Sequence, residues 1–220
     1  WQYSPDFPAP TSGEISQIAC MPRRARSIVA GGCYHVLNRG NNRATVFHFN
    51  AEYAAFTGLI CDAQERIPLE LFAACLMPNH FHLVVRPGGR DDIGRWIHWL
   101  LTTHSHRYHL GHATTGRVWQ GPYKAFPIEQ DEHLLTVLRY VERNAVRTGL
   151  VTRSRDWNWG SAAWRHGPRH LNRLLTQAPV KLPSNWDDFL DEPRTSQEAE
   201  ALRACVNRQR PYGTDEWIQA

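Results

Sequence analysis

Several features that define large protein classes are scarce or missing in this sequence of 220 residues. The five cysteines are odd in number, widely spaced and without a Cys-x-x-Cys pair, which argues against a disulfide scaffold. No apolar run approaches the roughly 20 residues that span a bilayer, and no Gly-x-x-x-x-Gly-Lys-Ser/Thr loop for nucleotide phosphates is present. We therefore expect a protein of the reducing cytoplasm, with no membrane partner and no P-loop ATPase activity.

The first 20 residues also lack the basic start and apolar core of a secretory signal. They are rich in Pro, Ser and Thr, and the first methionine is Met21. We interpret residues 1–20 as an extension, which is an upstream segment, a processed remnant or the result of a start assigned too early. The expected organisation is a domain over 21–165 followed by a C-terminal extension over 166–220.

The central segment of the sequence, in contrast, is rich in basic residues. Residues 1–20 carry a net charge of −2, residues 21–175 carry +9 and residues 176–220 carry −3, which together give the whole-chain value of +4. Nine Trp, seven Tyr and eight Phe accompany these charges. Basic groups bind phosphates and aromatic rings stack on bases, so single-stranded nucleic acid is a candidate partner.

Strand formers, turn residues and apolar periodicity predict one mixed α/β (α+β) domain. We expect strands over 33–39, 69–76 and 80–86, a loop and strand from Val118 to Ile128, and helices over 51–65, from Asp91 or Asp92, and from Asp131 to Gly149. This order is the split βαβ pattern of a ferredoxin-like or RRM-like fold with a central antiparallel sheet, followed by a further helix. The C-terminal extension is expected to be helical or looped, with a last helix near 196–207.

Two histidines lie two positions apart in the predicted strand 80–86. Because side chains alternate along a strand, His80 and His82 are expected on one face, about 6.6 Å apart, with Phe81 on the other. Two imidazoles so placed can reach one metal ion. His104 and His106 have the same spacing within a predicted helix, where they diverge and cannot chelate together.

The third predicted helix carries a tyrosine and an asparagine at the edge of its apolar stripe. Tyr140 and Asn144 are one turn apart, so the phenol and the amide are expected to lie together at the edge of the surface on which the helix packs. His133 and Arg147 lie near the same edge. Alone, this pattern also fits a boundary tyrosine that packs its ring and exposes its hydroxyl.

Together these motifs resemble a known family, the single-tyrosine HUH transposases, and within it the REP-associated tyrosine transposases. The resemblance is carried by Met77-Pro78-Asn79-His80-Phe81-His82-Leu83-Val84 and by Tyr140-x-x-x-Asn144-x-Val146-Arg147-x-Gly149-Leu150-Val151. It also includes Met21-Pro22-Arg23-Arg24, Tyr34-His35-Val36, Arg39-Gly40-Asn41-Asn42-Arg43 and Arg210-Pro211-Tyr212. The similarity runs from Met21 to about Val151 and resumes near Arg208.

The resemblance implies a metal-dependent enzyme that nicks and rejoins single-stranded DNA at REP-like hairpins. His80 and His82 would hold Mg²⁺ or Mn²⁺, Asn144 would complete the metal site, and Tyr140, on a catalytic helix after the sheet, would form a covalent 5′-phosphotyrosine. Because a phenol is mostly protonated at neutral pH, Tyr140 needs a base or the field of the ion. An amide is a weaker ligand than a carboxylate, so modest metal affinity is expected.

The resemblance also implies a set of DNA-binding residues that would hold the hairpin and its adjoining tetranucleotide. They are Arg23, Arg24, Arg26, Arg39, Asn42, Arg43, Arg208, Arg210 and Tyr212. We expect a monomer, with a dimer as the alternative.

Three other interpretations stay open at this point. The chain could be a catalytically silent RRM-like binder of single-stranded nucleic acid, although it lacks the aromatic strand signature of that class. Cys75, His80 and His82 could form a structural zinc site with one distant ligand. A rolling-circle initiator or relaxase would share the HUH chemistry in a different arrangement of motifs.

Overall fold

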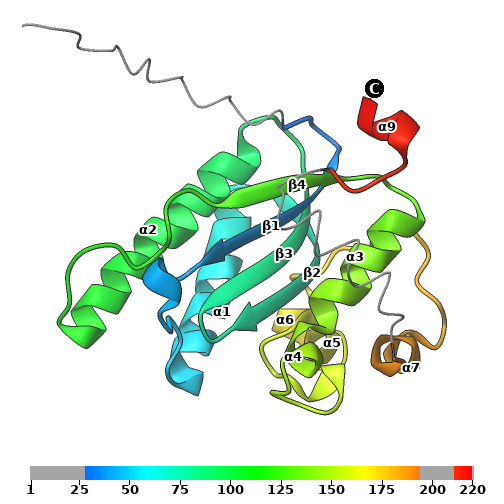
Figure 1. Cartoon of the computed structure of the whole chain (residues 1–220). Coiled ribbons are helices and arrows are strands. Elements are labelled where there is room, and N and C mark those ends of the chain that lie inside the picture. The colour runs from blue at the N-terminus through cyan, green and yellow to red at the C-terminus, as the bar shows by residue number, and fades with distance from the viewer. Residues whose placement is uncertain (1–27, 194–210, 220) are drawn as a thin grey trace, which may run out of the picture.

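A four-stranded antiparallel sheet forms the centre of the computed structural model, which describes residues 28–193 and 211–219. Its strands are β1 (Cys33–Arg39), β2 (Leu69–Met77), β3 (His80–Pro87) and β4 (Lys124–Ile128), in the order β2-β3-β1-β4. Helices α1 (Asn50–Arg66) and α2 (Asp92–His112) cover one face, and α3 (Glu132–Glu142) covers the other (Figure 1). The predicted ferredoxin-like order is confirmed.

Some predictions fall on residues outside this description. They are the extension 1–20, the arginine arm with Arg23, Arg24 and Arg26, the last helix near 196–207, and Arg208 and Arg210. Among the described residues, no helix is both long and apolar enough to cross a membrane.

The sheet separates two hydrophobic clusters, which explains why its strands are apolar on both faces. Phe81, Leu83 and Val85 of β3 pack under α1 and α2, whereas Val84 packs toward α3. The same alternation places His82 on the α3 side, and this side carries the polar groups described below.

The fourth strand is shorter than the sequence predicts. Val118 and Trp119 lie in the preceding loop, where Trp119 forms an isolated bridge with Gly40. Gly121, with φ of +59°, and Pro122 then interrupt the extended chain, so regular pairing with β1 begins only at Lys124.

The predicted helix from Asp131 to Gly149 forms as two pieces. The Asp131 side chain caps α3 by accepting the amide of His133, at 2.8 Å. Arg143, with φ of −87° and ψ of 1°, separates α3 from the short helix α4 (Asn144–Arg147). Gly149 follows with φ of +74° and ends α4, since this left-handed conformation suits glycine.

The chain after α4 forms short helices that lie along the β2 edge of the sheet and beside α3. They are η2 (Ser154–Asp156), α5 (Ser161–Trp164), α6 (Arg169–Asn172) and α7 (Trp186–Asp191), while η1 (Asn41–Arg43) follows β1 and α9 (Asp215–Gln219) lies in the C-terminal segment. Trp164 is buried, the indole of Trp157 donates to the Leu76 carbonyl at 2.9 Å, and Trp159 stacks on Tyr53. These tryptophans therefore serve packing, as the sequence indicates.

Candidate active site

Two imidazoles share the α3 face at the start of β3. The ring centroids of His80 and His82 lie 4.9 Å apart with an interplanar angle of 83°, whereas Phe81 between them is buried on the other face. On α2, His104 is buried and His106 is exposed, so that pair diverges as predicted for a helix.

The Nδ1 atom of each imidazole in this pair is engaged by a neighbour. His80 Nδ1 donates to Asn79 Oδ1 at 2.6 Å, and His82 Nδ1 lies 2.8 Å from Nε2 of the buried His35 on β1. The described part of the chain supplies no hydrogen bond to either Nε2 atom. In the tautomer in which each Nδ1 carries the proton, both Nε2 lone pairs are available to a metal ion, and the Nδ1 contacts fix the ring orientations.

Burial keeps all three imidazoles neutral, which is the form that binds metals. It lowers the pKa of His35 to about 3. Burial, assisted by the positive charges of Arg39 and Arg147, lowers the pKa of His80 to about 4. The same effects, together with the neighbouring imidazoles, hold the pKa of His82 well below its usual range.

Helix α3 places Tyr140 directly over this group. The Tyr140 ring centroid lies 5.8 Å from that of His82 and 6.1 Å from that of His35. The Arg147 guanidinium carbon is 5.8 Å from the centre of the tyrosine ring. A phenol, two candidate metal ligands and a cation thus meet at one end of the sheet, although they come from distant parts of the sequence.

Asn144, the first residue of α4, is fully buried beside Arg147. Its Oδ1 accepts from Arg147 Nη2 at 2.9 Å, and its Nδ2 is buried without a hydrogen-bond partner. Leaving a buried donor unpaired costs about 1–3 kcal/mol, so the amide is incompletely satisfied by the protein alone. An acceptor from outside the protein, such as a phosphate oxygen, would satisfy this donor, whereas a metal ion would bind the amide oxygen instead.

Positive charges surround the same end of the sheet. Arg39 on β1 stands directly opposite His80 in the strand register. Lys124 on β4 is opposite Leu37, which is in turn opposite His82, so the lysine lies on the same face. Lys124 was not predicted from the sequence, although the alternation of side chains along β4 indicates its face. With Arg147, these groups suit a phosphate.

Asn79 connects the histidine pair to the η1 loop. Besides its contact with His80, its Nδ2 donates to the Arg43 carbonyl at 3.0 Å, and its own carbonyl accepts the Gly40 amide at 2.7 Å. A Cβ at Gly40 would lie 2.2 Å from the Ala44 carbonyl oxygen, so glycine is required by close approach. Exposed Asn42 and Arg43 are therefore fixed next to the candidate metal ligands.

Tyr212 lies at the other end of α3. It forms a parallel bridge with Ile128, and its ring is 5.1 Å from the ring of His133. Tyr140 is seven positions after His133, or about 10 Å along the helix axis. Tyr212 therefore contacts the start of the helix that carries Tyr140.

The structure gives no support to a zinc site that includes Cys75. The Cys75 thiol is buried, which raises its pKa to about 12, and it donates to Met77 Sδ at 3.6 Å. Within residues 28–193 and 211–219, close groups of His, Cys, Asp and Glu occur only elsewhere, at His48, Glu52 and His112 and at Glu129, Asp131 and His133.

His35 carries no role in the sequence-based prediction, although it is part of the resemblance. Strand alternation would place it on the face of Arg39, but its contact with His82 depends on the register between β1 and β3. That register is a long-range property, so the imidazole pair could not be found from local spacing.

The chain is similar to known proteins in sequence and in structure. The profile of the family described as Transposase IS200 like matches residues 29–144, which is more than half of the chain. A predicted REP-associated tyrosine transposase of Haemophilus influenzae is 23% identical over 154 residues, covering 64% of this chain and 85% of that protein.

A solved structure shares this fold. A REP-associated tyrosine transposase bound to a REP hairpin has a TM-score of 0.57 and 21% identity, covering 80% of this chain and 99% of that chain. A predicted transposase of Deinococcus radiodurans is less similar, with a TM-score of 0.39 and 20% identity over 55% of this chain and 96% of that chain.

Proposed function

Because the chain belongs to the IS200-like transposase family, we propose that it nicks and rejoins single-stranded DNA beside REP-like hairpins, with Tyr140 as the nucleophile. The enzyme class, a DNA transposase, follows from the family. The observation that carries the finer proposal is the position of the Tyr140 ring, 5.8 Å from the ring of His82 and next to two unpaired imidazole nitrogens.

Members of this family generally use a divalent metal ion, and the residues at this site fit one. His80 and His82 would hold Mg²⁺ or Mn²⁺ through Nε2. Asn144 would add its amide oxygen, which has a second lone pair besides the one used by Arg147. When bound, the ion would polarise a phosphate oxygen and stabilise the charge that develops at phosphorus.

The nucleophilic step would use the phenol oxygen of Tyr140. A bond forms between this oxygen and phosphorus while the bond from phosphorus to the 3′ oxygen breaks. The phenol loses its proton, and the departing oxygen gains one to become a free 3′-hydroxyl. Arg147, beside the tyrosine ring, would stabilise the negative charge of the phosphate. The 5′-phosphotyrosine keeps the bond energy, so rejoining needs no ATP.

The basic groups around the tyrosine would hold the DNA strand that is cut. Arg39, Lys124 and Arg147 converge on the candidate site, while Arg43 and Asn42 project from the adjoining loop. The similar structure that contains a REP hairpin supports hairpin DNA as the partner. Roles for Arg23, Arg24, Arg26, Arg208, Arg210 and Tyr212 in DNA binding, and action as a monomer in the cytoplasm, stay predictions from the sequence.

Cleavage of labelled oligonucleotides tests this function. A hairpin flanked by single-stranded DNA should be cut in Mg²⁺ or Mn²⁺ and not in EDTA, whereas Tyr140→Phe should abolish cleavage and leave hairpin binding within about threefold of the wild type. Tyr53→Phe is the matched control, because Tyr53 packs on the opposite face of the sheet.

Two outcomes would contradict the proposal. Cleavage that survives in Tyr140→Phe would exclude this nucleophile. Metal-independent hairpin binding, without cleavage of any tested sequence, would favour the silent RRM-like interpretation.

A further inference from the structure

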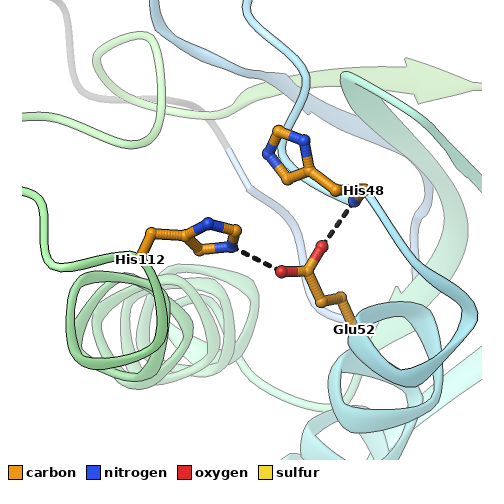
Figure 2. Close-up of side chains that lie close together, drawn as sticks. All are labelled: His48, Glu52 and His112. Carbon is orange, nitrogen blue, oxygen red and sulfur yellow. Dashed lines mark hydrogen bonds and ion pairs between the residues drawn. The ribbon is translucent and has the colours of Figure 1, made fainter.

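A second group of possible metal ligands lies on the side of the sheet that faces away from α3. His48 precedes α1, Glu52 is in the first turn of α1, and His112 is the last residue of α2 (Figure 2). His112 and Glu52 are 60 residues apart in the sequence. None of the three belongs to the candidate active site.

In Figure 2 the His112 ring and the Glu52 carboxylate point toward each other, and the His48 ring lies beside them. One ligand atom from each lies within 4.8 Å of the others. His112 Nε2 is 2.5 Å from Glu52 Oε1, and the centroids of the two imidazole rings are 5.0 Å apart. Four ligands around Zn²⁺ at about 2.1 Å stand roughly 3.4 Å from each other, so small rotations of these side chains would admit an ion.

A tyrosine between the two histidines restricts their rings. The Tyr108 ring stacks on His112 with centroids 4.2 Å apart, and its hydroxyl lies 3.2 Å from His48 Nε2. Outer contacts of this kind orient metal-binding imidazoles in known sites.

A helix cap explains only part of this arrangement. Glu52 accepts the backbone amide of His48 at 2.5 Å, as an acidic residue in the first turn of a helix often does. That contact uses one carboxylate oxygen. It does not account for His112, whose imidazole comes from the end of α2 and contacts the other carboxylate oxygen at 2.5 Å.

We propose that His48, Glu52 and His112 bind a divalent transition-metal ion, with Zn²⁺ as the expected species. Two imidazoles and one carboxylate are an established zinc ligand set that leaves the fourth position to water. Zn²⁺ binds imidazole and carboxylate ligands more tightly than Mn²⁺ or Mg²⁺ does, so this site is expected to hold zinc in preference to the ion used for DNA cleavage. The ion would tie the start of α1 to the end of α2, and we assign it a stabilising role separate from catalysis.

The test uses the full chain without a histidine tag. A His80→Ala background removes a candidate ligand of the active site, so that zinc bound there is not counted. After EDTA treatment and dialysis, the protein should take up one equivalent of Zn²⁺, and one equivalent of Co²⁺ should give visible d–d absorption. At a free Zn²⁺ concentration 100 times the Kd, the Tm should rise by about 5–10 °C.

His112→Gln and Glu52→Gln should each abolish the Co²⁺ absorption and the Tm increase, while His106→Gln, an exposed histidine on the same helix, should keep both. Far-UV circular dichroism would show that the variants are folded. Nicking by His112→Gln in the otherwise wild-type protein should be unchanged. No zinc uptake by the His80→Ala protein, or uptake that persists in the folded His112→Gln variant, would overturn the proposal.

Discussion

Replacing Glu142 should destabilise the protein through the packing of the helix that carries Tyr140. The Glu142 side chain is fully buried. Its Oε1 accepts from Ser161 Oγ at 2.5 Å and Arg165 Nη2 at 2.7 Å, and its Oε2 accepts from Trp186 Nε1 at 2.7 Å. Through these contacts, one carboxylate connects α3 to α5 and α7.

The size of the effect follows from the donors that are left unpaired. Glu142→Ala breaks a buried ion pair and should lower the free energy of unfolding by about 3–5 kcal/mol. Glu142→Gln keeps the volume and one acceptor oxygen, but its amide nitrogen would face the indole N–H of Trp186, which should cost about 1–3 kcal/mol. In a chain of this size the Tm should fall by about 6–20 °C and 2–12 °C respectively.

Urea unfolding followed by circular dichroism would measure both changes, with Glu65→Gln as the control. Glu65 is exposed on α1, so its replacement should change the free energy by less than about 0.5 kcal/mol. Glu142 is two residues from Tyr140, and both variants should therefore also nick DNA more slowly. Wild-type stability in Glu142→Ala would refute the idea that this carboxylate anchors α3.

Three further predictions concern other parts of the molecule. Asn79→Ala should weaken Mn²⁺ binding by about 10–100-fold in calorimetric titrations, because it frees the His80 ring; unchanged affinity would remove the positioning role of Asn79. Burial lowers the pKa of His104 to about 4. As the pH falls below 6.5, His104 therefore takes up a proton in the unfolded chain but not in the folded chain. The free energy of unfolding should fall as the pH drops from 6.5 to 4. By pH 5 this histidine should have lowered the free energy of unfolding by about 2 kcal/mol. In urea titrations of His104→Asn, the loss of stability on acidification should be smaller by that amount. If the Arg39 guanidinium contacts one phosphate, Arg39→Gln should reduce the slope of the logarithm of the DNA-binding constant against the logarithm of salt concentration by about 0.7 for single-stranded DNA. An unaltered slope would exclude that contact.

Features that depend on nearby residues could be predicted from the sequence. The shared face of His80 and His82 requires only the alternation of a strand, and the divergence of His104 and His106 requires only the turn of a helix. The sheet order likewise followed from the succession of strands and helices.

Features that depend on tertiary packing could not be predicted in the same way. The contact of His35 with His82 needs the β1–β3 register, and the buried network of Glu142 needs the positions of α5 and α7. The interruption at Arg143 has no glycine or proline to mark it in the sequence. The meeting of Tyr140 with the histidines was expected from family resemblance alone, because spacing within one segment says nothing about another.

Mass spectrometry of the protein after reaction with a hairpin oligonucleotide tests the central claim most directly. We predict a covalent adduct in Mg²⁺ or Mn²⁺ whose added mass equals the DNA on the 3′ side of the cut, with fragmentation assigning the 5′-phosphate to Tyr140 and a free 3′-hydroxyl on the released strand. An adduct on another residue, a link through a 3′-phosphate, or cleavage that proceeds with no covalent protein–DNA species would contradict the account.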